Sequence, residues 1–141
     1  MEFIVYSMPD GSINVVSPVR PIEEVIAKDL PPEASNVLIK TLVDLPPDRA
    51  FRSAWRISAN QVVVDMPRAR DLHMDKIRKA RDEKFSALDA EWMKFTGQNN
   101  KQEAERVEAK RQGLRALPQT TDLSKATTPE ELKAIWPDEL K

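Results

Sequence analysis

The sequence predicts an α+β fold. A small N-terminal β-rich module, made of a hairpin, further short strands and one short helix, precedes a long helix, an antiparallel helical hairpin and a short C-terminal helix. Short runs of β-branched and aromatic residues, separated by turn signals, fill residues 1–65. Apolar residues at helical spacing dominate residues 66–117. We therefore divide the chain into an N-terminal α+β module (1–65), a helical hairpin (66–117) and a C-terminal loop with a short helix (118–141).

The first elements form a predicted β-hairpin. Glu2–Ser7 is rich in β-branched and aromatic residues, and Ser12–Ser17 alternates as a returning strand. The Met8–Gly11 segment between them has the residues of a tight turn, because proline fixes φ and Asp-Gly supplies positive φ. Two strands alone are only marginally stable in water, so we expect the hairpin to pack on further elements.

Further short elements complete the module. Pro21–Asp29 carries apolar residues at helical spacing after an N-terminal proline, which predicts a short helix. Asn36–Val43 is a predicted third strand. Trp55–Ser58 and Gln61–Val64 are predicted to pair around a tight turn at residues 59–60. The module is therefore expected to contain four or five short strands.

The longest predicted element is a helix that follows Asp65, a natural N-cap residue, and ends at Gly97, the expected C′ residue. At about 1.5 Å per residue, its roughly 30 residues make a rod on the order of 45 Å long. A small β module cannot cover that length, so we expect part of the helix to pack on another helix or another chain. Its apolar residues lie within roughly 80° of one direction on a helical wheel. They are Ala69, Met74, Ile77, Ala80, Phe85, Ala87, Leu88, Trp92 and Phe95.

Two further helices are predicted after the long one. Lys101–Leu117 follows a short polar turn, so it should fold back as an antiparallel partner, and Pro118 is expected to end it. A final short helix should begin at Thr128, with proline at the first position and Glu131 closing a capping box. We expect this helix to be anchored by Leu132, Ile135 and Trp136.

Composition excludes several classes of function. The chain has no cysteine, which excludes disulfides, thiol chemistry and cysteine-ligated zinc, and which fits a protein that folds in a reducing cytoplasm. No apolar run approaches the roughly 20 residues of a membrane span, and the N-terminus lacks the pattern of a signal peptide. The net charge of -1 gives no global field toward nucleic acid or a membrane. We therefore expect no membrane partner.

No set of residues in the sequence predicts catalysis, a metal site or a cofactor site. His73 is the only histidine, and its neighbours Asp71 and Asp75 point away from it, because residues two apart on a helix lie about 200° apart. We expect His73 to lie on the helix surface or at an interface. The other carboxylates of this region interleave with basic residues, as on a solvated helix face. The chain is accordingly predicted to be non-enzymatic, with no cofactor.

A basic stretch leaves one alternative function open. Residues 68–84 hold seven basic and four acidic side chains, which gives this stretch a charge of +3. A nucleic-acid-associated factor could use these basic residues. However, they are spread around the helical wheel, whereas a nucleic-acid-binding helix needs a basic face on one side.

Four residues of the long helix are candidates for a protein interface. Arg81 and Lys84 fall inside the apolar stripe. Either their stems cover the core while their charges reach water, or they meet acidic groups on a partner. Trp92 and Phe95 lie at the far end of the helix, where a small module leaves little core to bury them. We therefore expect these two aromatic residues to contact the second helix or a neighbouring protein.

Four segments spread over nearly the whole chain match the pattern of one protein family. They are MPDGSINVVSP at residues 8–18, the "LP…DR.FR.AW" segment Leu45–Trp55, the helical stretch Asp65–Asp89, and an ending made of Leu114-Arg115 and Thr128–Pro137. On these residues the chain resembles the tail assembly chaperones, or tail accessory proteins, of tailed bacteriophages and prophages. Ala116 departs from the family's pattern, which often has aspartate there.

The resemblance implies a role in tail or tail-fibre assembly through protein–protein binding, and no catalytic residues. The implied partners are other tail proteins, namely fibre, tape measure or tail-tube and hub components, and the chain could also form a homo-oligomer. The implied location is the host cytoplasm during assembly, or the virion tail. A transient chaperone and a permanent accessory component of the virion are both compatible with the resemblance.

Overall fold

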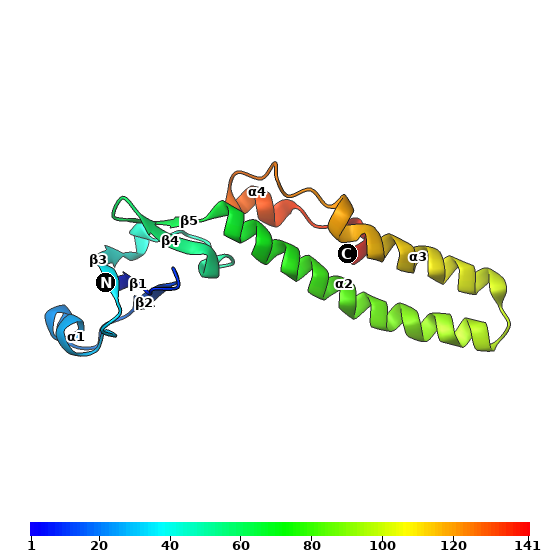
Figure 1. The fold of residues 1–141 in the computed structure, drawn as a ribbon, viewed down its shortest axis with the longest axis horizontal. Coiled ribbons are helices and arrows are strands. Elements are labelled where there is room, and N and C mark those ends of the chain that lie inside the picture. Colours follow the sequence, from blue (N-terminus) through cyan, green and yellow to red (C-terminus); the bar gives the residue numbers. More distant parts are fainter. The chain divides into compact units, whose positions relative to one another are not determined.

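The computed structural model describes residues 1–141 and confirms the α+β fold. Antiparallel strands occupy the first part of the chain, and long helices followed by a short helix occupy the rest (Figure 1). The chain divides into two compact units, an N-terminal unit, Met1–Ala69, and a C-terminal unit, Arg70–Lys141. None of the helices combines the length and the apolar character needed to span a bilayer.

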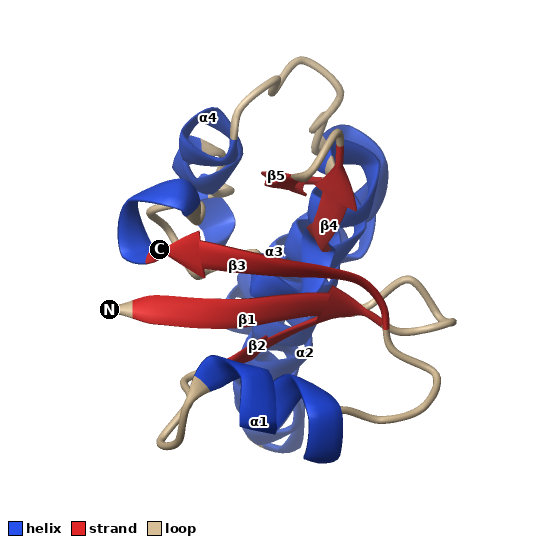
Figure 2. Cartoon of the chain, turned by 90° about the vertical axis from the view of Figure 1, so that its left-hand side faces the viewer, coloured by secondary structure: helices blue, strands red, loops and turns tan.

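The N-terminal unit is built around one central strand. The strands β1 (Glu2–Ser7), β2 (Ile13–Val16) and β3 (Ser35–Thr41) form an antiparallel sheet in the order β2-β1-β3 (Figure 2). Ile4 of β1 lies opposite Val16 on one side and Ile39 on the other. The position of β1 explains why its sequence is almost continuously apolar, since a central strand has neighbours at both edges and layers on both faces.

Each face of β1 packs on a different element. Ile4 and Tyr6 are buried together with Val25 of α1 (Ile22–Lys28). Alternate residues of a strand point to opposite faces, so Val5 belongs to the other face. There it packs with residues from the chain that follows the sheet, namely Leu45, Trp55 and Val62.

The covering layer on this second face is a predicted hairpin that the structure confirms. β4 (Trp55–Ser58) pairs with β5 (Gln61–Val64) in the antiparallel register Ser58 opposite Gln61. Ala59 and Asn60 both have positive φ, the backbone that a two-residue hairpin turn requires. Two short 3₁₀ turns precede the hairpin, η1 (Leu42–Asp44) and η2 (Arg52–Ala54).

The third strand is shorter than the sequence predicts. It was expected to reach Val43, but β3 ends at Thr41. Asp44 accepts hydrogen bonds from the backbone N–H and the hydroxyl of Thr41, at 2.9 and 2.8 Å. These bonds cap the 3₁₀ turn and draw residues 42–44 out of the extended conformation. A register shift against β1 accompanies the positive φ of Asn36.

The C-terminal unit is dominated by two antiparallel helices (Figure 1). The helix α2 (Met66–Gly97) has 32 residues, and α3 (Lys101–Thr120) has 20. Gly97 was expected just beyond α2, but it is the last helical residue, and Asn99 instead takes the positive φ of the turn. Asparagine tolerates this conformation because its short side chain forms local hydrogen bonds.

Pro118 does not end α3, contrary to the prediction. The helix continues to Thr120, and the N–H of Thr121 donates to the carbonyl of Leu117 at 2.9 Å. Proline removes its own hydrogen bond and crowds the carbonyl four residues back, but residues beyond it can still donate to the preceding turn. The burial of Leu117 holds that last turn in place.

A short helix and a 3₁₀ turn complete the C-terminal unit. In α4 (Pro129–Ala134), the Thr128 hydroxyl accepts from the N–H of Glu131 at 3.2 Å, as predicted. The reciprocal half of the capping box differs, since the Glu131 carboxylate accepts from the N–H of Thr127 at 2.9 Å. The final 3₁₀ turn, η3 (Asp138–Leu140), was not predicted.

Candidate protein-binding groove

The two long helices share a core that covers only part of their length. On α2, the fully buried residues of the C-terminal unit are His73 and Ile77, and no α2 residue beyond Ile77 is fully buried. On α3, Val107, Leu114 and Leu117 are buried. The expected surplus of apolar surface on the long helix is therefore present as half-buried side chains along its last 20 residues.

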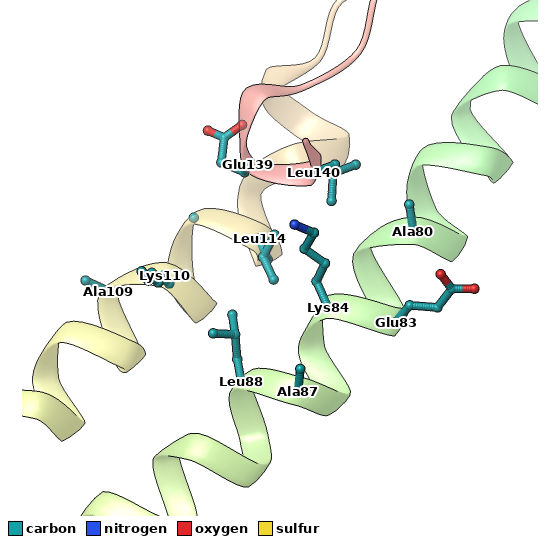
Figure 3. Close-up of a pocket in the computed structure, with 11 residues that line it drawn as sticks. Ala80, Glu83, Lys84, Ala87, Leu88, Ala109, Lys110, Leu114, Glu139 and Leu140 are labelled. Atoms are coloured by element: carbon teal, nitrogen blue, oxygen red, sulfur yellow. The ribbon is translucent and has the colours of Figure 1, made fainter.

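Part of this surplus lines an open pocket of about 870 Å³ between α2 and α3 (Figure 3). Apolar residues form its floor, and several of them are small, which leaves the helix backbones close to the surface. Charged side chains of both signs form its rim. The apolar lining consists of Ala80, Ala87, Leu88, Ala109, Gly113, Leu114 and Leu140, and the charged lining of Glu83, Lys84, Lys110 and Glu139. We call this pocket the α2–α3 groove.

The two basic candidates on α2 have partners within the chain. Lys84 reaches across the groove, and its Nζ donates to the main-chain oxygen of Lys141 at 3.2 Å (Figure 3). Arg81 is half-buried, lies 3.4 Å from the carboxylate of Asp82 and has its guanidinium 6.0 Å from the ring centroid of Phe85. Their stems thus cover apolar surface, and a contact with a partner protein stays a prediction.

The two aromatic candidates lie near the turn that joins the helices. Trp92 and Phe95 are both half-buried. The guanidinium of Arg111 stacks over the Trp92 ring at 5.1 Å from its centroid, and Lys94 lies 5.7 Å from that of Phe95. Trp92 also lines a second pocket of about 330 Å³ at this end of the hairpin. Both rings are therefore accessible, and their role in an interface stays a prediction.

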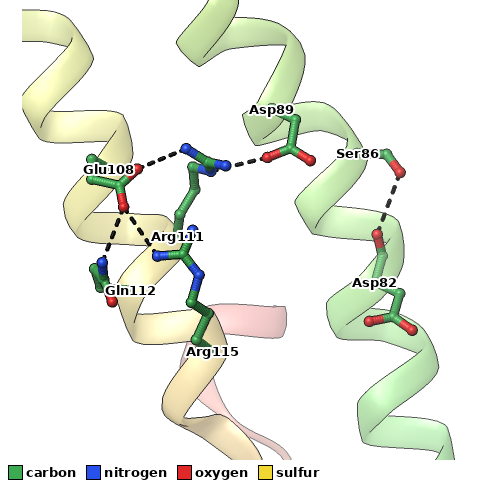
Figure 4. A network of polar contacts seen from close by, with 7 residues as sticks. All are labelled: Asp82, Ser86, Asp89, Glu108, Arg111, Gln112 and Arg115. Atoms are coloured by element: carbon green, nitrogen blue, oxygen red, sulfur yellow. Dashed lines mark hydrogen bonds and ion pairs between the residues drawn. The ribbon is translucent and has the colours of Figure 1, made fainter.

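Arg111 ties the two helices together beside the groove (Figure 4). Its Nη1 donates to Glu108 on the same helix at 2.7 Å. Its Nε lies 2.9 Å from Asp89 on α2, in an ion pair too bent for a hydrogen bond. Glu108 also accepts from Arg115 at 3.0 Å and from Gln112 at 3.1 Å. The hydrogen bond from Arg115, together with the positive charge of Arg111, lowers the pKa of the Glu108 carboxyl.

His73 does not lie on the helix surface, which corrects the first of the two positions expected for it. Its side chain is buried, and its Nε2 donates to the carbonyl of Ile135 at 2.7 Å. The carbonyl can only accept, so Nε2 carries the proton. The imidazole ring also meets Trp136 edge to face, with 6.0 Å between centroids. His73 therefore holds the C-terminal segment against α2.

The basic residues of 68–84 serve several separate contacts. Arg70 donates to the carbonyl of Ala126 at 2.8 Å, and Arg78 pairs with Asp75 at 3.2 Å. Arg81 and Lys84 have the partners described above. These residues are thus engaged in different directions within the chain. No cluster of three or more His, Asp or Glu side chains is placed to hold a metal ion.

Sequence reasoning missed the residues that turn the apolar stripe into a groove. Leu140 closes one end of the groove, yet nothing in the local sequence connects this residue with Leu88 or Leu114. Gly113 also lines the groove, and its missing side chain deepens the groove floor. The sequence signal that indicates the groove is a stripe of small residues, which includes Ala80, Ala87 and Ala109. Comparison of the chain with protein-family models, with curated proteins and with solved structures gives no match.

Proposed function

We propose that this chain is a non-enzymatic bacteriophage tail protein that acts in tail or tail-fibre assembly by binding another tail protein. The observation that supports binding is the α2–α3 groove, an apolar floor of about 870 Å³ within a charged rim. Grooves of this kind between helices commonly receive an amphipathic helix. The resemblance in four segments of the sequence supports the phage setting.

The chemistry of the groove favours a helix as the occupant. Ala87, Ala109 and Gly113 are small, so a helix can bring its backbone close to the floor, as small residues allow at other helix contacts. The rim carries Glu83 and Glu139 together with Lys110. An occupant with a narrow apolar stripe, flanked by side chains of both charges, complements this rim. Fibre, tape measure and tail-tube or hub proteins are the proposed sources of such a helix.

A pair of matched substitutions tests the groove. Ala87 and Ala90 are both exposed alanines of α2, but only Ala87 lines the groove. We expect Ala87→Glu to abolish co-purification with the tail partner after co-expression, because a carboxylate would be buried against an apolar helix face. Ala90→Glu should leave it unchanged. Equal retention of the partner by both variants would contradict binding at the groove.

Mass spectrometry of purified phage particles separates the two versions of the function. A protein that is retained as an accessory component is present at a fixed ratio to the other tail proteins. A transient chaperone is found with its partner in lysates of infected cells, but not in finished particles. Failure to associate with any tail protein in either setting would contradict the proposed function itself.

A further inference from the structure

Exposed apolar residues of the N-terminal unit gather at one edge of its sheet. Seven large hydrophobic residues of the chain are well exposed, and five of them belong to this edge or its end. Ile39 is 49% exposed and Val43 is 90% exposed. Met1 and Leu42 flank the paired residues Glu2 and Thr41, so they lie at the same end of the sheet. The five residues are Met1, Val37, Ile39, Leu42 and Val43.

The backbone of this edge is also unpaired on its outer side. β3 is the last strand in the order β2-β1-β3, and β4 and β5 form a separate sheet. An edge strand presents a row of free N–H and C=O groups, which act as a template for another strand. Proteins usually protect such edges with several charges or a proline, but Lys40 is the only charged residue of β3. The edge thus offers backbone hydrogen bonds and apolar side chains together.

We propose that β3 pairs with β3 of a second copy of this chain, antiparallel and across a two-fold axis at Ile39. The two three-stranded sheets then form one continuous six-stranded sheet. In this register Ile39 meets its own counterpart, and Val37 of each copy meets Thr41 of the other. All these residues are β-branched and lie on one face of the sheet, the combination that stabilises cross-strand pairs.

The charges on the strand agree with this register. Lys40 of each copy comes opposite Leu38 of the other, so that no like charges face each other. A register centred on Lys40 would bring the two ammonium groups together, which is destabilising. Asn36, which has positive φ, lies outside the paired residues 37–41, and the register shift against β1 falls between Leu38 and Ser35, at the end of that segment. A two-fold contact uses the same edge twice and closes, whereas pairing of β3 with β2 would continue into filaments.

The edge of β3 is therefore complementary to the same edge of a second copy. The contact involves only the N-terminal unit, so it does not depend on the proposed role of the groove or on a tail partner. It would make the protein a dimer whose two grooves belong to separate copies.

Disulfide trapping tests the register directly. The natural chain contains no cysteine, so Ile39→Cys introduces the only thiol. Opposite residues in an antiparallel pair have Cβ atoms about 4.5–5.5 Å apart, close enough for a disulfide to form with small adjustments. We expect mild oxidation of Ile39→Cys to give a covalent dimer. Met93→Cys is the control, since Met93 is 69% exposed on α2 and should not cross-link at the same protein concentration.

Molar mass in solution provides the second measurement. We expect the unmodified chain to sediment as a dimer, and Ile39→Lys to weaken dimerisation at least about tenfold, because it replaces an apolar pair with two like charges. Met93→Lys should leave the dimer unchanged, and circular dichroism verifies that both variants fold. A monomeric unmodified chain at about 100 μM, open-ended filaments, or a dimer that tolerates Ile39→Lys without cross-linking through Ile39→Cys would each overturn the proposal.

Discussion

The central strand of the N-terminal unit and the long helix of the C-terminal unit bury their apolar residues to very different degrees. In β1, Ile4 and Val5 are fully buried although they point to opposite faces, because α1 covers one face and the β4–β5 hairpin the other. In α2, no residue beyond Ile77 is fully buried. A short strand in the middle of a layered module is enclosed by its neighbours, whereas a 32-residue helix requires neighbours along its whole length.

The exposed apolar surface consequently differs in kind between the two units. In the N-terminal unit it accompanies free backbone groups along β3, a surface that fits another strand. In the C-terminal unit it is made of side chains between two helices, a surface that fits another helix. The two units can thus bind partners of different secondary structure.

The largest expected effect comes from replacing one phenylalanine in each unit with alanine. Phe51 is 1% exposed, whereas Phe95 is half-buried. We expect Phe51→Ala to destabilise the N-terminal unit by about 3–5 kcal/mol, because it leaves a cavity. Phe95→Ala should cost the C-terminal unit only about 1 kcal/mol, because less apolar area is involved. Hydrogen exchange measured separately over each unit reports both changes, and equal losses would remove the contrast between them.

A smaller effect is expected at His73, where the C-terminal unit has a well-packed polar contact. His73→Phe keeps a ring near Trp136 but leaves the carbonyl of Ile135 without its donor. The loss should be about 1–3 kcal/mol, the usual penalty for an unsatisfied buried group. Urea unfolding measures the total, and faster exchange in residues 129–140 would locate it. Unchanged exchange there would mean that the histidine does not hold this segment.

Gly113→Ala is expected to stabilise the C-terminal unit. A Cβ at this position meets no atom within 4 Å, and the residue lies inside α3. Alanine should therefore add about 0.5–1 kcal/mol through its higher helix propensity. Thermal unfolding would show a higher midpoint for this unit. An unchanged or lower midpoint would indicate that the open space at Gly113 is needed within the folded chain.

Low pH should destabilise the C-terminal unit more than the N-terminal unit. This is the smallest of the expected effects. The pKa of Glu108 is lowered by the hydrogen bond from Arg115 and by nearby positive charges. Because the folded state binds this proton less readily than the unfolded state, the stabilisation is present above the ordinary value of 4.5 and is lost as the pH falls through the lower folded pKa. Glu108→Gln should flatten the pH dependence of unfolding below that value, and an identical profile would contradict the assignment.

Other carboxyl groups contribute to the same difference. Hydrogen bonds from Ser124, Thr127 and Lys141 lower the pKa values of Asp122, Glu131 and Asp138 in the C-terminal unit. In the N-terminal unit, Ser12 and Thr41 do the same for Asp10 and Asp44. Unfolding followed in each unit between about pH 5 and 2 measures whether the unit with more such carboxyls loses more stability.

Local chemistry predicted most of the elements. The β4–β5 hairpin occurs at the predicted residues, because β-branched runs and a turn that tolerates positive φ specify it within ten residues. The errors fall where a distant or capping contact overrides local preference. Asp44 shortens β3, and the packing of Leu117 carries α3 past Pro118. His73 is buried because a segment some 60 residues later in the chain returns to it.

Only part of the α2–α3 groove could be predicted from the sequence, because contacts between distant residues determine the rest. The helical wheel identified the apolar stripe of α2 and its four candidate residues. It could not show that Leu114 and Leu140 would line the same groove, because their proximity depends on how the chain folds back. The exposed β3 edge was likewise hidden, since strand order cannot be read from the pattern of a single strand.

The central place of β1 also fixes the order in which the chain can fold during synthesis. β1 can pair with β2, its neighbour in sequence, as soon as both have been synthesised. Glu2 can pair with Thr41 only after β3 has also been synthesised. At about 5–20 residues per second, that wait is on the order of seconds on the ribosome. Val5 can be buried only later, after Trp55 and Val62 have been synthesised. In the helical hairpin, which is closed by a three-residue turn, contacts near that turn, such as Asp89 with Arg111, join residues closer in sequence and can form as soon as α3 has been synthesised.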